Sequence, residues 1–253
     1  MLNLWFNRLV AFAYQYQREA TPYKQLIADF ASFLPLRGNE TVLDIGCGSG
    51  KIMETVWEKS KGMVKRIVGL DCSKTALEYA RDNLAKICSA VNSRMAFISA
   101  DISQGLPFER LGQKGGFDLV TAGLSIQYAE NWDGKHWTQK AYRQVIQDIF
   151  EALKPGGSFV FSVNTPNPDF SQIAKKSWRE IIFSWRLPFN LFVAAIMVWQ
   201  GKWLTNQARI GHFHYLPIED VEMILRHVGF QDIKYKLTYA GLAWVVSCQK
   251  PPN

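Results

Sequence analysis

The sequence has few cysteines, and no two of them form a C-x-x-C pair. The four cysteines are scattered along the chain, at Cys47, Cys72, Cys88 and Cys248. Structural zinc sites and disulfide frameworks use closely and regularly spaced cysteines, so this arrangement argues against both. We therefore expect reduced thiols, a cytoplasmic location and no bound metal.

A hydrophobic run long enough to span a membrane is also missing. The uncharged stretch from Leu187 to Gly201 lies between Arg186 and Lys202, and it is shorter than the ~20 apolar residues that a spanning helix needs. The apolar patch Leu9 to Ala13 is too short for a signal peptide and has no A-x-A cleavage site. Aromatic and basic residues at both ends of the uncharged stretch favour an interfacial helix or a lid over an apolar pocket. A helical hairpin packed on the core is the alternative.

Acidic residues are scarce between Phe170 and Ile210, where Glu180 is the only one. The basic residues of the same segment are Lys175, Lys176, Arg179, Arg186, Lys202 and Arg209. The net charge of +7 is therefore concentrated there, and it is compatible with nucleic acid, an anionic membrane surface or acidic substrates as partners.

A glycine-rich turn is the most informative feature that is present. The stretch TVLDIGCGSGK begins with the apolar residues Val42, Leu43 and Ile45, which suit a strand buried on both faces. Three glycines follow within five residues, and they allow positive φ angles and close approach of a ligand to the backbone. A helix can start at Lys51. The order is strand, glycine turn and helix, which points free N–H groups towards the carboxyl edge of a sheet.

The spacing of these glycines separates two cofactor classes. A dinucleotide fingerprint, G-x-G-x-x-G, would need its third glycine at position 51, which is Lys51. The chain instead has Asp44 followed by G-x-G-x-G from Gly46 to Gly50. This pattern resembles the S-adenosylmethionine site of the Rossmann-like (class I) methyltransferases of the small-molecule type. The alternative is a glycine turn that closes an ordinary βα unit.

The resemblance extends to the strings LKPGGSFVFSV and IEDVEMILRHVGF. It implies an α/β fold with a seven-stranded, mostly parallel sheet, one antiparallel strand and helices on both faces. We expect a single domain, 1–253, with an N-terminal helical cap (1–38) and a helical insertion or lid (164–216) before the last helix–strand unit. Hydrophobic periodicity predicts helices over 73–90 and 137–153 and a strand over 158–163.

Acidic residues follow the predicted second and third strands. Asp71 lies roughly 20 residues past the glycine turn, where an acid can accept both ribose hydroxyls; stabilisation of the next helix N-terminus is the alternative. The resemblance implies that Asp101 meets the adenine amine and that Ile102 packs on the ring; an ordinary loop aspartate is the alternative. The implied cofactor-binding set is Asp44, Gly46, Cys47, Gly48, Gly50, Asp71, Cys72, Asp101, Ile102 and Gly123.

The predicted fourth strand, Phe117 to Thr121, leads into Gln127 and Tyr128, which we expect to contact the methyl acceptor. No [DN]-P-P-[YFW] motif follows this strand, which argues against methylation of DNA amines. The absence of any Pro-Cys pair argues against a thiolate mechanism at cytosine C5.

Three residues are candidates for a catalytic or substrate-contacting role. They are Tyr128 and two histidines, His212 and His214, which lie where the insertion returns to the fold. His136 and His227 have a surface or structural role in our interpretation.

We therefore expect a methyltransferase that uses S-adenosylmethionine and acts on a small, lipophilic or aromatic acceptor, with a membrane surface as a further partner. The alternatives are an RNA or protein methyltransferase, with nucleic acid the less favoured partner, and a protein that binds S-adenosylmethionine without catalysis.

Overall fold

The structure is a computed structural model that describes residues 18, 20–89, 91–112, 114–177 and 187–252. These residues form a seven-stranded sheet with the strand order β3-β2-β1-β4-β5-β7-β6. The strands are β1 (Thr41–Ile45), β2 (Arg66–Asp71), β3 (Met95–Ser99), β4 (Phe117–Gly123), β5 (Leu153–Asn164), β6 (Gln231–Thr238) and β7 (Ala243–Gln249).

One strand of the sheet runs against the others. β7 is antiparallel to both of its neighbours, β5 and β6, whereas β1 pairs in parallel with β2 and β4. The predicted sheet, mostly parallel with one antiparallel strand, is confirmed. The chain leaves β1 towards β2 and returns on its other side at β4, and the carboxyl ends of strands at such a switch point form the ligand crevice of open α/β sheets.

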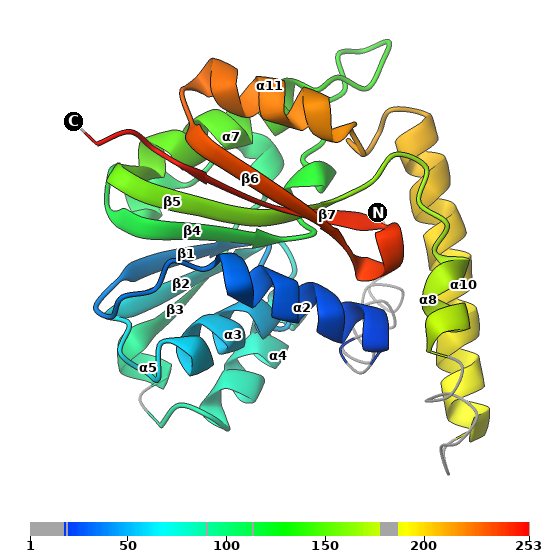
Figure 1. The fold of residues 1–253 in the computed structure, drawn as a ribbon, viewed down its shortest axis with the longest axis horizontal. Coiled ribbons are helices and arrows are strands. Elements are labelled where there is room, and N and C mark those ends of the chain that lie inside the picture. The colour runs from blue at the N-terminus through cyan, green and yellow to red at the C-terminus, as the bar shows by residue number, and fades with distance from the viewer. Residues whose placement is uncertain (1–17, 19, 90, 113, 178–186, 253) are drawn as a thin grey trace.

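Helices cover both faces of the sheet (Figure 1). The α-helices are α2 (Thr21–Phe33), α3 (Lys51–Lys59), α4 (Lys74–Ala85), α5 (Val91–Arg94), α6 (Phe108–Leu111), α7 (Lys140–Ala152), α8 (Ser171–Lys176), α10 (Leu187–Arg209) and α11 (Ile218–Val228). Three 3-10 turns are η1 (Ile102–Gln104), η2 (Ile126–Tyr128) and η3 (Tyr239–Gly241).

Alternate residues of the strands feed two hydrophobic cores. In β1, Leu43 and Ile45 belong to the core that α7 and α11 complete, whereas Val42 belongs to the core formed with α2, α3 and α4. A strand buried on both faces reads as a continuous apolar run, and this is why the glycine turn is preceded by one.

Helix α2 is fixed to the edge of the sheet by a buried acid. Asp29 accepts hydrogen bonds from Lys236 Nζ at 2.7 Å and from the Thr238 hydroxyl, both on β6. Gln25, one turn earlier, also donates to it at 3.0 Å. These bonds tie the N-terminal helix to one of the last strands of the chain.

Several element boundaries differ from the sequence-based expectations: α7 begins at Lys140 rather than at position 137, and β4 continues to Gly123. α4 ends at Ala85 rather than reaching position 90, which lies outside the described residues. β5 begins at Leu153, because Leu153 already pairs with Phe117 of β4. A bulge that contains the glycines at 156 and 157 then shifts the register, so that Ser158 pairs with Leu119. α10 continues beyond the uncharged stretch as far as Arg209.

Helix α10 stands along one side of the molecule, next to α8 (Figure 1). The Phe170 ring packs on Gly201, where an added Cβ would lie 2.6 Å from the Cβ of Phe170. No helix among the described residues has the length and apolarity that a membrane crossing requires.

Candidate cofactor and acceptor sites

The glycine turn joins β1 to α3, and each of its three glycines has a positive φ angle: 63° at Gly46, 52° at Gly48 and 85° at Gly50. A Cβ on Gly46 would lie 2.3 Å from Ser125 Cβ, and one on Gly50 would lie 3.2 Å from Ala80 Cβ. No described atom lies within 4 Å of a Cβ built on Gly48. Two glycines thus allow close packing, and the middle one leaves open space above the backbone.

Asp71, the last residue of β2, braces this turn. Its Oδ2 accepts from the backbone N–H of Gly48 at 2.9 Å, and its Oδ1 accepts from the N–H of Ser73 at 2.8 Å. Burial raises the pKa of Asp71, and the hydrogen bonds from Ser73 and Gly48 oppose this shift. A carboxylate has about four lone-pair positions, so each oxygen can accept a further donor.

Asp44 is almost completely buried within β1, with 1% of its surface exposed. Its Oδ1 accepts from the Thr121 hydroxyl at 2.8 Å, whereas Oδ2 has no hydrogen-bond partner among the described residues. Burial raises the pKa of Asp44 to about 7. A buried carboxylate oxygen without a partner is costly, and a cation beside it would remove the cost.

The N-terminal helix reaches over this acid. Tyr23 of α2 is partly buried. Desolvation raises its pKa to about 12, with Asp44 and Glu54 adding to the shift and Arg18 opposing it. Arg18 donates to the backbone carbonyl of Ser49 at 2.9 Å and lies 3.4 Å from Glu54. The described part of the predicted cap therefore contacts the glycine turn; residues 1–17 and 19 lie outside the described residues.

The remaining predicted cofactor residues line the same edge of the sheet. Asp101 follows β3, whose last residue pairs with Asp71, and its side chain accepts from the N–H of Ser103 at 2.9 Å. Ile102 packs on the core, Cys47 is buried and Cys72 is exposed. Gly123 ends β4 against Ile52 of α3.

The turn after β4 is held over the glycine turn. Leu124 has a φ of 51°, an uncommon conformation for a residue with a branched side chain. Its N–H donates to the Ser162 hydroxyl at 3.0 Å, and the Ser125 hydroxyl donates to the Ile45 carbonyl at 2.6 Å. These bonds join the carboxyl ends of β1, β4 and β5.

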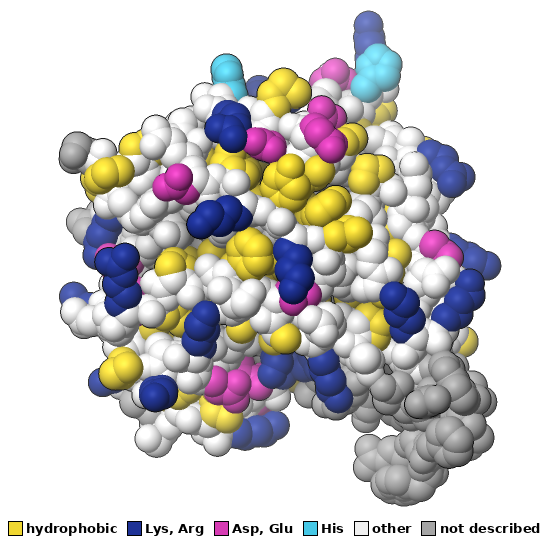
Figure 2. Space-filling view, viewed as in Figure 1, with side chains coloured by type: hydrophobic (Ala, Val, Ile, Leu, Met, Phe, Trp, Pro, Cys, Tyr) yellow, Lys and Arg dark blue, Asp and Glu magenta, His cyan; other side chains and the backbone are white. Residues whose placement is uncertain are grey.

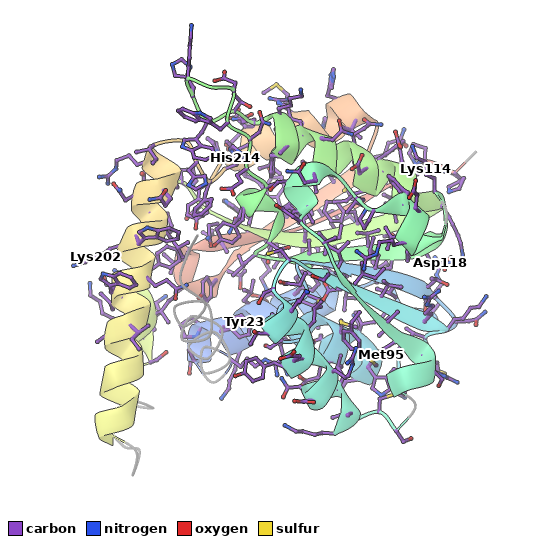
Figure 3. All side chains as sticks on the ribbon, turned by 180° about the vertical axis from the view of Figure 1, so that it is seen from behind. Tyr23, Met95, Lys114, Asp118, Lys202 and His214 are labelled. Atoms are coloured by element: carbon purple, nitrogen blue, oxygen red, sulfur yellow. The ribbon has the colours of Figure 1, made fainter. Side chains whose placement is uncertain are left out.

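Residues 212–215 pack beside the turn after β4, where the N–H of His214 donates to the backbone carbonyl of Gln127 at 2.9 Å. The Phe213 ring meets Tyr128 edge-on at 4.8 Å between centroids, and the hydroxyls of Tyr215 and Tyr128 lie 3.1 Å apart. The His214 ring lies 5.5 Å from the Tyr142 ring of α7. Figure 3 shows His214 near the C-terminal end of α10.

The His212 ring stacks on Trp137 at 3.8 Å and on Phe213 at 4.5 Å, and its two nitrogens contact Gln207 and Glu130. The structure therefore brings Tyr128 together with Phe213 and Tyr215. His212 reaches this group of rings through Phe213, and the His214 ring lies beside Tyr142. Burial lowers the pKa of His214. His136 and His227 are exposed.

Three contributors were missed by sequence reasoning. Thr121 pairs with Asp44 in the register of β1 and β4, so alignment of the two strands could have found it. Tyr215 and Asn164 carried no local signal, because they reach Tyr128 and Gln127 only through tertiary packing.

Comparison with known proteins identifies the family of this chain. A model of a methyltransferase domain family matches residues 36–205. This chain belongs to that methyltransferase family. S-adenosylmethionine is the methyl donor of the family, so the predicted enzyme class and cofactor are confirmed.

Several relatives agree with this assignment. A demethylmenaquinone methyltransferase of Lactococcus lactis is 29% identical over 216 residues, 84% of this chain and 75% of that protein. One from Leptospira interrogans is 27% identical over 226 residues, 85% of this chain and 76% of that protein.

Solved structures confirm the fold. A Mesorhizobium loti S-adenosylmethionine-dependent methyltransferase matches with a TM-score of 0.59 at 17% identity, covering 92% of this chain and 100% of that one. The Haemonchus contortus phosphoethanolamine N-methyltransferase 2, in complex with S-adenosylmethionine, matches with a TM-score of 0.63 at 16% identity, covering 98% of this chain and 58% of that one.

Proposed function

We propose that this methyltransferase transfers the methyl group to a small, lipophilic or aromatic acceptor. The observation that carries the proposal is the group of rings at the carboxyl end of β4, where Phe213 packs on Tyr128 at 4.8 Å and on Trp203 of α10 at 5.8 Å. Apolar rings beside the reaction centre favour an apolar acceptor and exclude water. The names of the relatives, demethylmenaquinone methyltransferases and a Caenorhabditis elegans sterol 4-C-methyltransferase, agree with this class.

The cofactor is proposed to lie over the glycine turn. The unpartnered Oδ2 of Asp44 suits an ammonium group, and the open space above Gly48 admits a ligand against the backbone. Asp71 has lone pairs left for the ribose hydroxyls, and Asp101 with Ile102 follows the next strand, where the adenine would lie. Cys47, Cys72, Gly46, Gly50 and Gly123 complete the proposed lining.

S-adenosylmethionine supplies an electrophilic methyl group on a sulfonium. Bound over the glycine turn, it would offer this methyl group to the acceptor's electron pair and would leave as S-adenosylhomocysteine, which keeps the electron pair of the broken carbon–sulfur bond; an acceptor that must lose a proton would release it to solvent. The protein's own contribution is alignment of the two reactants and exclusion of water, and alignment alone can supply roughly 7–11 kcal/mol.

Tyr128 is the first candidate for contact with the acceptor, because it lies among the rings. His214 is the second, since its Nε2 is buried without a hydrogen-bond partner among the described residues. His212 is proposed to position the end of α10, because it joins Gln207 of that helix to Glu130 of the loop after β4. In this proposal the described part of the segment 164–216 acts as a lid, with residues 178–186 outside the described residues, and the described part of the N-terminal cap covers the cofactor.

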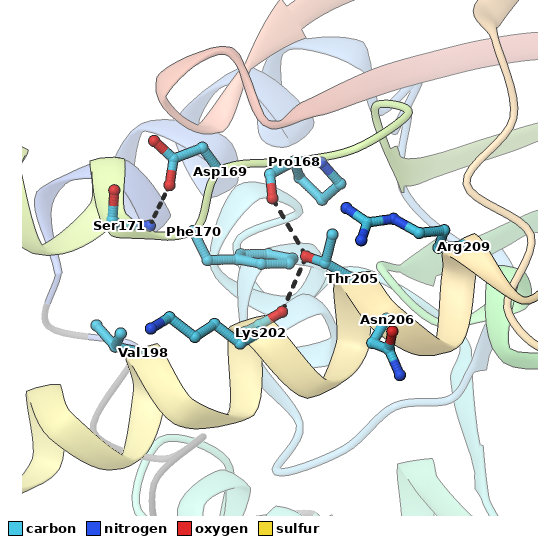
Figure 4. A pocket seen from close by; sticks show the side chains of 10 residues that line it. Pro168, Asp169, Phe170, Ser171, Val198, Lys202, Thr205, Asn206 and Arg209 are labelled. Atoms are coloured by element: carbon cyan, nitrogen blue, oxygen red, sulfur yellow. Dashed lines mark hydrogen bonds between the residues drawn. The ribbon is translucent and has the colours of Figure 1, made fainter.

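We also propose that α10 contacts an anionic membrane surface. Trp199 and Trp203 are 56% and 36% exposed, and Trp and Lys at a helix surface suit the lipid headgroup region. Beside them, α10 and the start of α8 enclose a cavity of about 370 Å³ (Figure 4). Its lining includes the basic residues Lys202 and Arg209.

Vesicle flotation tests the membrane contact. The wild-type protein should float with vesicles containing phosphatidylglycerol at low salt, and Lys202→Gln with Arg209→Gln should weaken this binding. Vesicles of phosphatidylcholine alone are the control. Equal flotation with both lipids, or none with either, contradicts an electrostatic contact.

Label transfer tests the acceptor class. The protein is incubated with methyl-labelled S-adenosylmethionine and, in separate reactions, with lipid extract, RNA and cell protein. The proposal expects label in a lipophilic small molecule. Label in RNA or protein would select the alternative class. On the face drawn in Figure 2, Lys and Arg are interspersed with acidic and apolar side chains, and no basic patch that would favour nucleic acid is seen there. Absence of label from every fraction, with S-adenosylmethionine bound, would favour a non-catalytic protein.

A further inference from the structure

Two buried amide side chains at the carboxyl ends of β4 and β5 have unmet hydrogen-bonding groups. Gln127 is fully buried and Asn164 is 2% exposed. The Oε1 of Gln127 accepts from the backbone N–H of Asn164 at 2.6 Å. Gln127 Nε2 and Asn164 Oδ1 have no hydrogen-bond partner among the described residues. Buried polar groups are nearly always paired in proteins, so an unpaired donor and acceptor side by side need an explanation.

The hydroxyl of Tyr128 lies beside these amides. It is 3.1 Å from the hydroxyl of Tyr215, and hydrogen bonding by the nearby Gln127 and Asn164 side chains opposes the rise in its pKa. Burial, together with Tyr215, raises the pKa of Tyr128 well above its ordinary value. Tyr128 is therefore a neutral hydroxyl that donates or accepts a hydrogen bond, and it is a poor general base.

The cluster lies next to the proposed cofactor site along the same edge of the sheet. β4 pairs with β1 through Thr121 and Asp44, and with β5 through Gly123 and Ser162. Gln127 and Tyr128 follow β4, and Asn164 ends β5. Because carboxyl ends of parallel strands share one edge, Gln127, Tyr128 and Asn164 lie at the edge of the sheet that also carries the proposed cofactor site. Tyr215 joins them through the hydroxyl of Tyr128.

The groups that act on Tyr128 among the described residues are all uncharged: Tyr215, Gln127 and Asn164. A carboxylate, phosphate or ammonium group bound here would lose its hydration without gaining an opposite charge. A neutral hydroxyl, in contrast, can donate to an amide oxygen while it accepts from an amide or tyrosine donor. The two tyrosine hydroxyls and two amide side chains therefore suit a ligand oxygen that both donates and accepts a hydrogen bond.

We propose that Tyr128, Tyr215, Gln127 and Asn164 form a subsite that binds a neutral hydroxyl group of the acceptor, as in a phenol, hydroquinone or enol. The inference rests on the proposed function and narrows it, since a lipophilic acceptor without such a hydroxyl leaves the buried amides unpaired. Enzyme sites that hydrogen-bond a substrate hydroxyl reject analogues that lack it far more strongly than apolar pockets do.

The test compares 2-naphthol with its methyl ether, 2-methoxynaphthalene, as probes of the saturated S-adenosylhomocysteine complex, with binding followed by naphthalene fluorescence. Wild-type protein should bind the naphthol about tenfold more tightly than the ether. Tyr128→Phe and Tyr215→Phe should each reduce this ratio to about twofold. Binding of 2-naphthoic acid should be weaker than that of the naphthol, because its carboxylate meets no positive group.

Tyr142→Phe is the matched control. Tyr142 is a buried tyrosine of α7 whose hydroxyl also lacks a partner among the described residues, but it faces His214 and not Tyr128. It should keep the wild-type ratio, and thermal melts of all three variants exclude unfolding. A wild-type ratio near one, or a ratio that both Phe variants leave unchanged, overturns the subsite. Binding of neither probe by the wild type contradicts the proposed acceptor class, and the subsite falls with it.

Discussion

The carboxylate of Asp71 accepts a hydrogen bond of 2.9 Å from the backbone N–H of Gly48, although the two residues are 23 positions apart in the chain. The end of β2 thus fixes the middle of the glycine turn. The same carboxylate also accepts from Ser73, which begins α4. One acid therefore shapes the turn and remains available to a ligand, which makes both residues sensitive points of the proposed cofactor site.

Replacement of Asp71 by Asn should weaken S-adenosylmethionine binding by about tenfold or more. The amide N–H₂ would face the backbone N–H of Gly48 or of Ser73, and it cannot accept a hydrogen bond from a ribose hydroxyl. Isothermal titration calorimetry measures the loss. Adenosine and 2′-deoxyadenosine separate the two effects: the wild type should prefer adenosine, and the variant should bind both alike. Wild-type affinity in Asp71→Asn would contradict the proposed role.

Gly48→Ala should also lower the affinity for S-adenosylmethionine by about tenfold, because its Cβ enters open space that the ligand is proposed to fill. The matched control is Gly115→Ala, since Gly115 has a φ of 66° and no described atom within 4 Å of an added Cβ. Both variants carry similar backbone strain of about 1–2 kcal/mol and should lose similar thermal stability. Equal ligand affinity in the two variants would sink the prediction. Alanine is a cleaner probe than valine, whose branched side chain is poorly tolerated at positive φ.

The affinity for S-adenosylmethionine should fall as the pH drops below about 7, the value to which burial raises the pKa of Asp44. A cationic ligand binds the ionised acid, so protonation competes with it. From pH 8 to pH 5.5 the dissociation constant should rise by about tenfold or more. Asp44→Asn should bind weakly and without this pH dependence; a pH-independent wild type would show that Asp44 does not face the ligand's charge.

In the absence of ligand, ionised Asp44 should lower the free energy of unfolding. Its folded pKa lies above the ordinary value of 3.8, so the ionised form is disfavoured by folding once the pH exceeds 3.8, and the penalty is complete above about 7. Asp44→Asn is therefore expected to melt at a higher temperature than the wild type at pH 8 and at a similar temperature near pH 3.5. A lower melting temperature at pH 8 would contradict this balance.

Asp29→Asn should destabilise the protein at pH 7 by about 1–3 kcal/mol, because α2 loses its charged partner on β6. Burial opposes ionisation of Asp29, but the hydrogen bonds from Lys236, Thr238 and Gln25 hold its pKa below 3.8. Its contribution is thus present above pH 3.8 and is lost as the pH falls through the folded value. Urea unfolding at pH 7 and pH 2.5 measures the difference, which should be smaller at the lower pH.

A pair of lysine variants controls for charge in that experiment. Lys236→Gln should destabilise the protein at pH 7, whereas Lys234→Gln, an exposed position on the same strand, should change the stability little. Equal effects of the two variants would indicate that general charge, and not the bond to Asp29, stabilises the edge.

The fold and the cofactor class could be predicted from the sequence because their signals are local. The spacing from Asp44 to Gly50 and the apolar run before it specify a strand, a turn and a helix within a dozen residues. The seven-stranded, mostly parallel sheet was implied by the resemblance to the class I methyltransferases, and the apolar run before the turn agrees with a strand buried on both faces. The start of β5 and the extent of α10 were less accurate, because a bulge opposite Phe117 and packing on Phe170 depend on distant residues.

The acceptor side was harder to predict for a physical reason. Tyr128 was a candidate, but its neighbour Tyr215 lies 87 positions later in the chain. The two histidines that stood out by type have other neighbours: His212 stacks on Trp137 and Phe213, and His214 lies beside Tyr142. Side-chain direction in the segment 212–215 depends on which residues the core accepts, and residue type does not reveal it.

A crystal structure of the complex with S-adenosylhomocysteine tests the central claim most directly. The account predicts the ligand's ammonium group at hydrogen-bond distance from Asp44, its ribose on Asp71, and its sulfur directed along the sheet edge towards Tyr128. An adenosyl ligand bound elsewhere, with the space above Gly48 still open at saturating concentration, would contradict it.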